Sequence, residues 1–120
     1  MSFPPDEVDE LKRCYSGLVA AQEGGVEFIR IPKLRLPPGC EPAVVEALFC
    51  PHGRGDGYSS RLFLSAKVDH NGRGKNWNAD GVAILGKQWW AVSWNAAPAN
   101  GQPVKQRLAA ILAAHLEAFK

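Results

Sequence analysis

The chain has 120 residues, of which 46% are hydrophobic and 22% charged, and its formal net charge is +2. This composition is typical of a globular domain, and the balanced charge argues against a dedicated duplex-DNA-binding protein, which usually has a strongly basic face. No apolar run approaches the length of a membrane span, and the opening MSFPPDEVDELKR has neither the basic end nor the apolar run of a secretory signal. We therefore expect one cytoplasmic domain over residues 1–120.

The segment PPDEVDELKRCYSGLVAAQ, residues 4–22, is predicted to be a helix. Its apolar side chains recur at helical spacing, at Val8, Leu11, Tyr15 and Leu18. Two prolines followed by acidic residues are typical of a helix start, where carboxylates face the positive end of the helix dipole. The pair Gly24–Gly25 is predicted to end the helix.

Three strands are predicted next, and they are VEFIRIPKLRLPPG (residues 26–39), PAVVEALFCP (42–51) and RLFLSAKV (61–68). Pro32 interrupts the first strand. Because proline cannot donate to a strand ladder, its presence predicts that this strand lies at a sheet edge.

The polar, unperiodic stretch DHNGRGKNWNADG, residues 69–81, predicts a long loop, and such loops are often functional. A short apolar piece and the tryptophan-rich stretch GKQWWAVSWN (86–95) follow. The last segment, 103–119, has one apolar stripe and Pro103 at its expected first helical position. The order of an N-terminal helix, an antiparallel meander sheet, a long loop and a C-terminal helix predicts an α+β fold with helices covering one face of the sheet.

The three cysteines have no paired spacing, so the sequence predicts neither a disulfide framework nor a zinc site, and we expect no metal or cofactor. In FCPHG, Cys50 and His52 could act as thiolate and base, but a cysteine that ends an apolar strand is more often a small buried hydrophobe. His115 lies on the apolar stripe of the last helix and is interpreted as a core residue. His70, in the predicted loop, is the better candidate for a functional histidine.

The four tryptophans allow three interpretations. The four, Trp77, Trp89, Trp90 and Trp94, could be core, a wall of a reactive site, or, with the basic residues Arg73, Lys75 and Lys87, a stacking surface for single-stranded nucleic acid. Consecutive tryptophans cannot face the same side of a strand, so at least one is expected to pack on the final helix. Binding of nucleic acid is the least favoured of the three.

Five segments in this order, LRLPPGC, AVVEALFCP, GDGYSSRLFLSAKV, WWAVSWN and VKQRLAAILAAHL, resemble the divergent bacterial E2-like proteins of the ubiquitin-conjugating superfamily. The resemblance covers residues 28–116. It implies an N-terminal helix, a four-stranded antiparallel meander and a C-terminal helix. It also implies a role in ubiquitin-like modification, with an E1-like activating protein and a ubiquitin-like protein as partners.

In the same family a His-Pro-Asn motif precedes the catalytic cysteine. Here DHNG offers His70 and Asn71 without the proline, and no cysteine follows Cys50. An alcohol is far less acidic than a thiol and needs a base beside it. The resemblance therefore implies Ser93 as the nucleophile of an oxyester with the ubiquitin-like C-terminus and His70 as its base.

The remaining roles implied by the resemblance concern the surroundings of this serine. Asn71 or Asn95 would donate an amide hydrogen bond to the oxyanion. Trp89 and Trp94 would brace the reactive loop against the last helix. Two other hypotheses stay open, which are a catalytically inactive E2-like adaptor that binds its partners, and a small single-strand nucleic-acid-binding module. Cys50 as a relocated nucleophile ranks behind Ser93 and the adaptor.

Overall fold

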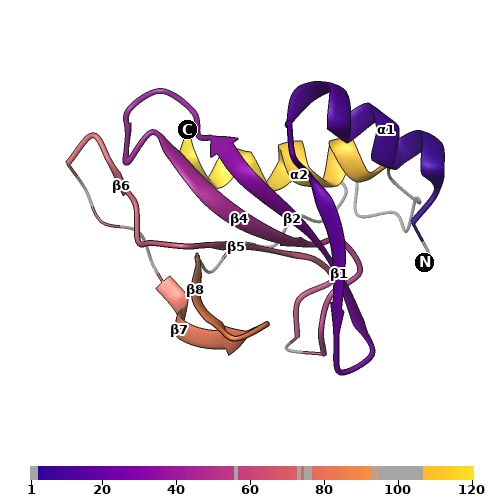
Figure 1. Cartoon of the computed structure of the whole chain (residues 1–120). Helices are drawn as coiled ribbons and strands as arrows, with labels where there is room; N and C mark the ends of the chain where they lie inside the picture. Colours follow the sequence, from indigo (N-terminus) through magenta and orange to yellow (C-terminus); the bar gives the residue numbers. More distant parts are fainter. Residues whose placement is uncertain (1–2, 56, 73, 75–76, 93, 95–106) are drawn as a thin grey trace.

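The computed structural model describes residues 3–55, 57–72, 74, 77–92, 94 and 107–120. Its helices are α1 (Pro5–Cys14) and α2 (Leu108–Leu116), with a 3-10 turn at Glu117–Phe119. Its strands are β1 (Val19–Glu23), β2 (Val26–Arg35), β3 (Cys40–Glu41), β4 (Val44–Cys50), β5 (Arg61–Leu64), β6 (Asp69–His70), β7 (Trp77–Ile84) and β8 (Lys87–Val92). The α+β class and the antiparallel character predicted from the sequence are confirmed (Figure 1).

The described strands form one antiparallel sheet in the order β1-β2-β4-β5-β8-β7, and β3 pairs with β6 in a separate two-stranded ribbon. The first four strands of the sheet are a meander. The β7–β8 hairpin then adds through its second strand, so that β7 and not β8 lies at the edge.

Both helices lie on the same face of the sheet (Figure 1), where the helix-side cluster forms the larger core. Its most deeply buried large members are Leu11, Ile29, Ile31, Leu34, Phe49, Leu64, Leu108, Leu112 and Phe119. Polar contacts also join the helices. Glu7 of α1 accepts a hydrogen bond from the Leu108 backbone N–H, and Arg107 pairs with Asp6 and Glu10. The acidic residues of α1 therefore cap the start of α2 as well.

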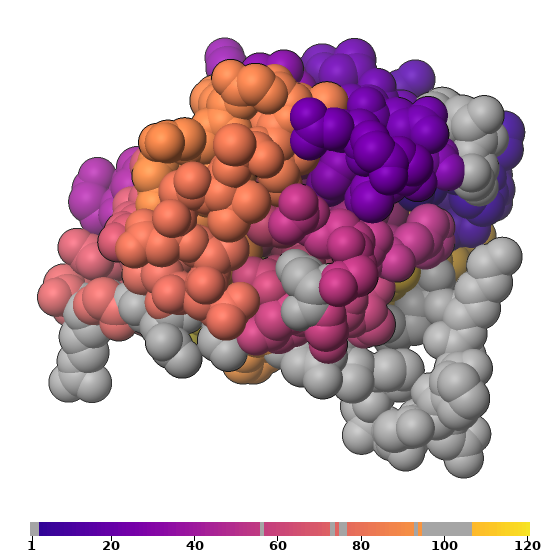
Figure 2. Space-filling view, turned by 90° about the horizontal axis from the view of Figure 1, so that it is seen from below, coloured from indigo at the N-terminus to yellow at the C-terminus, as the bar shows by residue number. Residues whose placement is uncertain are grey.

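The opposite face of the sheet is covered by the β7–β8 hairpin. The hairpin-side cluster consists of Phe28, Leu48, Cys50, Phe63, Ala79, Ile84, Trp89 and Ala91. The sheet is curled so that the tips of the β1–β2 and β7–β8 hairpins are in contact. The Leu85 backbone N–H donates a hydrogen bond to Glu23 Oε1 at 3.1 Å. In Figure 2 the violet β1–β2 hairpin and the orange β7–β8 hairpin lie side by side.

The predicted first helix, residues 4–22, is too long, since α1 ends at Cys14 and residues 19–23 form β1. Gly24 and Gly25 have φ angles of 58° and 79° and connect the paired residues Glu23 and Val26. A two-residue turn with both φ angles positive is the turn that suits a β-hairpin. The glycine pair is thus a hairpin turn and not a helix stop.

The prediction that Pro32 marks an edge strand is also wrong, because β2 lies between β1 and β4. β1 pairs with β2 only as far as Arg30, and the register between β2 and β4 shifts between Ile31 and Leu34. Pro32 therefore lies where neither neighbour requires its N–H, which is the bulge position that tolerates proline.

The long loop predicted over 69–81 is only partly a loop. Residues 69–70 form β6, and residues 77–84 form β7. Two register shifts and Gly81, at φ 76°, interrupt the alternation of β7 and hide the strand from a periodicity argument. The strands predicted over 26–39 and 61–68 end earlier, at Arg35 and Leu64. The predicted start of the last helix at Pro103 lies outside the described residues, and α2 is described from Leu108.

Candidate functional site

Two residues of the proposed reactive centre, Ser93 and Asn95, lie outside the described residues. Their neighbour Trp94 is described. Its indole Nε1 donates to the Ala114 carbonyl of α2 at 2.8 Å, and 37% of the residue is exposed. Trp94 therefore contacts the last helix, and its role as a brace of a reactive loop stays a prediction.

His70 and Asn71 hold a neighbouring chain segment in place. His70 Nε2 donates to the Pro38 carbonyl at 3.2 Å, and the Asn71 backbone N–H donates to the Gly39 carbonyl at 2.8 Å. The segment approaches so closely that a Cβ atom on Gly39 would lie 2.6 Å from Asn71 Oδ1 and 3.1 Å from His70 Nε2. The His70 side chain and the Asn71 backbone thus have a structural role at the β3–β6 ribbon.

The strand directions place His70 and the end of β8 toward opposite ends of β5. β5 and β8 are antiparallel and pair at Leu64 and Trp90, so β8 runs back toward the start of β5, whereas His70 lies beyond its end. None of the hydrogen bonds and ring contacts between described residues joins His70 or Asn71 to Trp89 or Trp94. The described part of the chain therefore does not assemble the predicted base and amide beside Trp94.

A serine–histidine pair exists elsewhere, at Ser60 and His115. The Ser60 Oγ and His115 Nε2 atoms are 2.8 Å apart, and the two residues are only 5% and 4% exposed. Burial, and secondarily the positive charge of Arg61, lowers the pKa of His115 to about 4, so the imidazole is neutral near pH 7. Because a substrate cannot reach this pair, it anchors α2 to the segment before β5, and the interpretation of His115 as a core residue is confirmed.

Cys50 and His52 lie in different surroundings. Cys50 is fully buried in the hairpin-side cluster, and the His52 ring stacks on Phe3 with 5.6 Å between centroids. Cys50 is therefore the small buried hydrophobe favoured above, and its fully buried position does not suit the role of a relocated nucleophile.

The tryptophans of β8 and its end point to three different partners. Trp89 is 1% exposed, packs in the hairpin-side cluster and donates from Nε1 to the Ile84 carbonyl. Trp90 donates from Nε1 to Asp80 at 2.8 Å. The expectation that Trp89 braces the last helix is wrong. The alternation of β8 turns its ring to the sheet face opposite the helices.

The basic residues near Trp89 are paired with a carboxylate. Glu46 forms ion pairs with Arg30 and with Lys87. Burial opposes ionisation of Glu46, but the hydrogen bonds from Lys87 and Arg30 outweigh it and lower the pKa of the carboxyl group. Trp89 and Lys87 are therefore not available for stacking on single-stranded nucleic acid, and the hypothesis for the other tryptophans stays a prediction.

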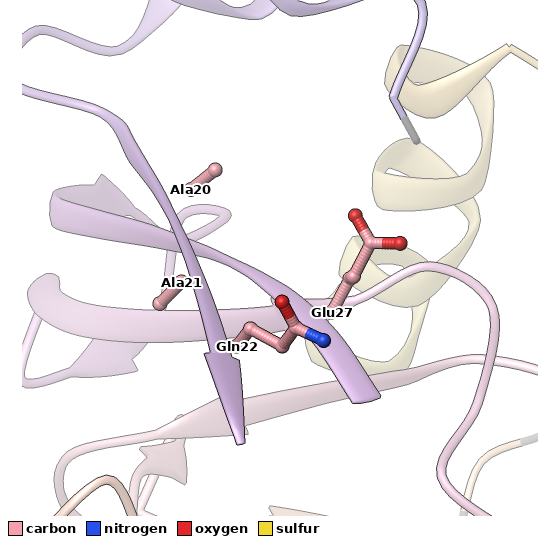
Figure 3. A pocket seen from close by; sticks show the side chains of 4 residues that line it. All are labelled: Ala20, Ala21, Gln22 and Glu27. Carbon is pink, nitrogen blue, oxygen red and sulfur yellow. The ribbon is translucent and has the colours of Figure 1, made fainter. Parts of the chain in front are cut away.

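The described surface is hollowed between its elements. One hollow of about 400 Å³, the α2 hollow, lies between the end of α1, the β2–β3 connection and α2, and is lined by Cys14, Tyr15, Arg35, Leu36, Pro37, Pro38, Ala113, Leu116 and Lys120. One of about 220 Å³ lies between α1 and β1, and one of about 250 Å³ lies beside β1 (Figure 3). Since His70 binds Pro38, the β3–β6 ribbon supports one wall of the α2 hollow.

Within the described residues, no three side chains of the histidine, cysteine and acidic types gather in a way that could hold a metal ion, and neither helix has the length and apolar character needed to cross a membrane. Comparisons with models of protein families, with curated proteins and with solved structures give no match.

Proposed function

We propose that this chain is an E2-like adaptor that binds a ubiquitin-like protein or its E1-like activating protein without carrying a covalent intermediate. The observation that supports a binding role is the engagement of His70 and Asn71 with Pro38 and Gly39. A general base has to come within hydrogen-bond distance of the proton that it removes. His70 donates to the Pro38 carbonyl at the β3–β6 ribbon, so it is not positioned to act as a base beside Trp94.

The arrangement of elements agrees with an E2-like reading at the level of the fold. A meander of β1, β2, β4 and β5 carries α1 before it and α2 after it, with both helices on one face (Figure 1). The α2 hollow lies on the helix side and is lined by apolar residues with Arg35 and Lys120. An apolar surface with two basic residues suits a protein partner that presents both apolar and acidic groups.

The experiment mixes the purified chain with the ubiquitin-like and E1-like proteins of the same source, ATP and magnesium. The adaptor proposal predicts a measurable dissociation constant by calorimetry and no higher-mass band on a denaturing gel. Loss of binding on Arg35→Glu, with unchanged binding for the matched surface variant Arg13→Glu, would place the contact at the α2 hollow. Absence of binding to either protein would contradict the E2-like proposal.

The carrier hypothesis is tested in the same mixture. An adduct that hydroxylamine removes and thiols do not would be an oxyester, because thioesters exchange readily with thiols. If Ser93→Ala abolishes that adduct while the chain still binds its partners, the adaptor proposal is wrong and the chain is a serine-dependent carrier.

A further inference from the structure

The outer edge of β1 offers unpaired backbone groups. β1 lies at one end of the sheet order, and no strand among the described residues pairs with its outer side. The two-residue turn is closed by the pair Glu23 and Val26, and in an antiparallel ladder hydrogen-bonded pairs then alternate with non-hydrogen-bonded ones. Consequently Ala20 and Gln22 direct their N–H and C=O groups away from β2.

The two edges of the sheet differ in their protection against further pairing. β7 carries two register shifts, Gly81 and Asp80, which are features that discourage strand addition. β1 is VAAQE, with neither proline nor lysine, and its pairing with β2 is regular throughout. Val19, at 53% exposure, is the most exposed large hydrophobic residue of the described chain. The unprotected edge is therefore β1.

We propose that β1 pairs in an antiparallel manner with β1 of a second copy of this chain, about a two-fold axis at Ala21. In this register Ala20 of each copy faces Gln22 of the other, and the outward backbone groups of both residues form four hydrogen bonds. The two Ala21 residues face each other as a non-hydrogen-bonded pair. The six-stranded sheets of the two copies become continuous.

The strand is complementary to itself in this register. Its one charged residue, Glu23, falls opposite Val19 of the second copy, so no like charges meet, and Val19 becomes covered. Ala20, Gln22 and Glu27 border a hollow of about 250 Å³ on the helix side of the edge (Figure 3). Because Ala20 is small, the Gln22 side chain of the second copy fits beside it into this hollow. The proposal is independent of the proposed adaptor function.

Cysteine cross-linking tests the register in a Cys14→Ser background, which removes the exposed native thiol. Ala21→Cys is expected to form a disulfide-linked dimer under mild oxidation, since opposed residues in a non-hydrogen-bonded pair have Cβ atoms close enough to bridge. Ala20→Cys is the matched control. Its two copies lie diagonally across the axis, about 7–8 Å apart or more, and should remain unlinked. Equal cross-linking of both variants, or of neither, would overturn the proposal.

A charge swap tests the interface in solution by sedimentation from ~10 μM to ~1 mM, the range expected of a small interface. The parent chain should self-associate. Ala21→Lys and Ala21→Glu should each be monomeric, because like charges then face each other across the axis, and an equimolar mixture should associate again. A parent chain that stays monomeric, or a mixture that does not associate, would contradict the pairing. Circular dichroism of each variant verifies that the monomer remains folded.

Discussion

The two faces of the sheet are covered by different means. The helix-side cluster joins residues from Phe3 to Phe119, so the two ends of the described chain close it. The hairpin-side cluster is smaller and is closed by one hairpin that is contiguous in sequence. The tryptophan-rich stretch serves both, because Trp89 fixes the hairpin over one face while Trp94 binds α2 over the other. One short segment thus links the two cores.

The polar groups of the two faces differ in the same way. On the helix side the polar contact within the core is the neutral, buried pair Ser60 and His115, and the ion pairs of Arg107 lie at the exposed ends of the helices. On the hairpin side it is an ionic group in which Glu46 pairs with Arg30 and Lys87 and remains in partial contact with solvent. We therefore expect acid to weaken the helix side more than the hairpin side, through His115, and salt to weaken the ion pairs of both sides.

The largest effect is expected for Trp89→Ala. Trp89 is 1% exposed and is the largest fully buried side chain, so its truncation leaves a cavity in a small cluster. We expect a loss of about 3–5 kcal/mol in the free energy of unfolding, measured by urea denaturation. Trp94→Ala is the matched comparison on the helix side and should cost less, because more than a third of Trp94 is already exposed. Equal losses would contradict the assignment of the two tryptophans to differently packed faces.

The second prediction concerns the pH dependence of the helix side. The pKa of His115 is about 4 in the folded chain against 6.5 in the unfolded one, so below pH 6.5 the unfolded state binds a proton that the folded state does not. Stability from this residue is present above pH 6.5 and is lost as the pH falls toward 4, by about 3 kcal/mol in all.

The measurement is the free energy of unfolding between pH 7.5 and pH 4. The variant His115→Gln keeps a hydrogen-bonding group for Ser60 but cannot titrate, so its profile should be flatter than that of the parent. Carboxyl groups titrate in both chains and cancel in the difference. Parallel profiles for parent and variant would show that His115 does not titrate differently in the two states.

The apolar periodicity of the sequence was enough to predict those elements whose apolar side chains recur with a single period. The start of α1 and the helix of α2 have regular apolar spacing, and the core position of His115 follows from that spacing. β4 was predicted instead from an apolar run between two prolines. Periodicity failed where a turn or bulge interrupts it. The Gly24–Gly25 pair between VAAQE and VEFIR is a hairpin signal that could have revealed β1.

The candidate site was less predictable than the fold. His70 was selected because a polar loop offered no packing role, but β6 pairs with β3 from a distant part of the chain and gives it one. Such a two-residue pairing has no periodic pattern to detect. The orientation of Trp89 could not be inferred either, because it depends on which strand β8 joins.

The third prediction tests the β3–β6 ribbon at the margin of the helix side. Gly39 has φ 95°, and a Cβ there would contact Asn71 Oδ1 at 2.6 Å, so Gly39→Ala is expected to cost about 1–3 kcal/mol. Gly25→Ala is the control, since Gly25 has φ 79° but nothing within 4 Å of the new Cβ. Thermal unfolding should show the larger loss for Gly39→Ala. Identical losses would mean that backbone strain alone, and not the approach of Asn71, explains the effect.

The smallest effect is expected for the ionic group on the hairpin side. Glu46→Gln removes the charge that pairs with Arg30 and Lys87 while it keeps the size of the side chain, and pairs in contact with solvent are worth about 1 kcal/mol or less. Because the pKa of Glu46 is lowered on folding, its contribution to stability is present at neutral pH and disappears in acid.

The free energy of unfolding measured at low and high salt should show a difference between parent and variant that shrinks as salt rises. Lys67→Gln, at the exposed pair with Asp80, provides a matched loss of one surface ion pair, and a larger effect there than at Glu46 would contradict the ranking.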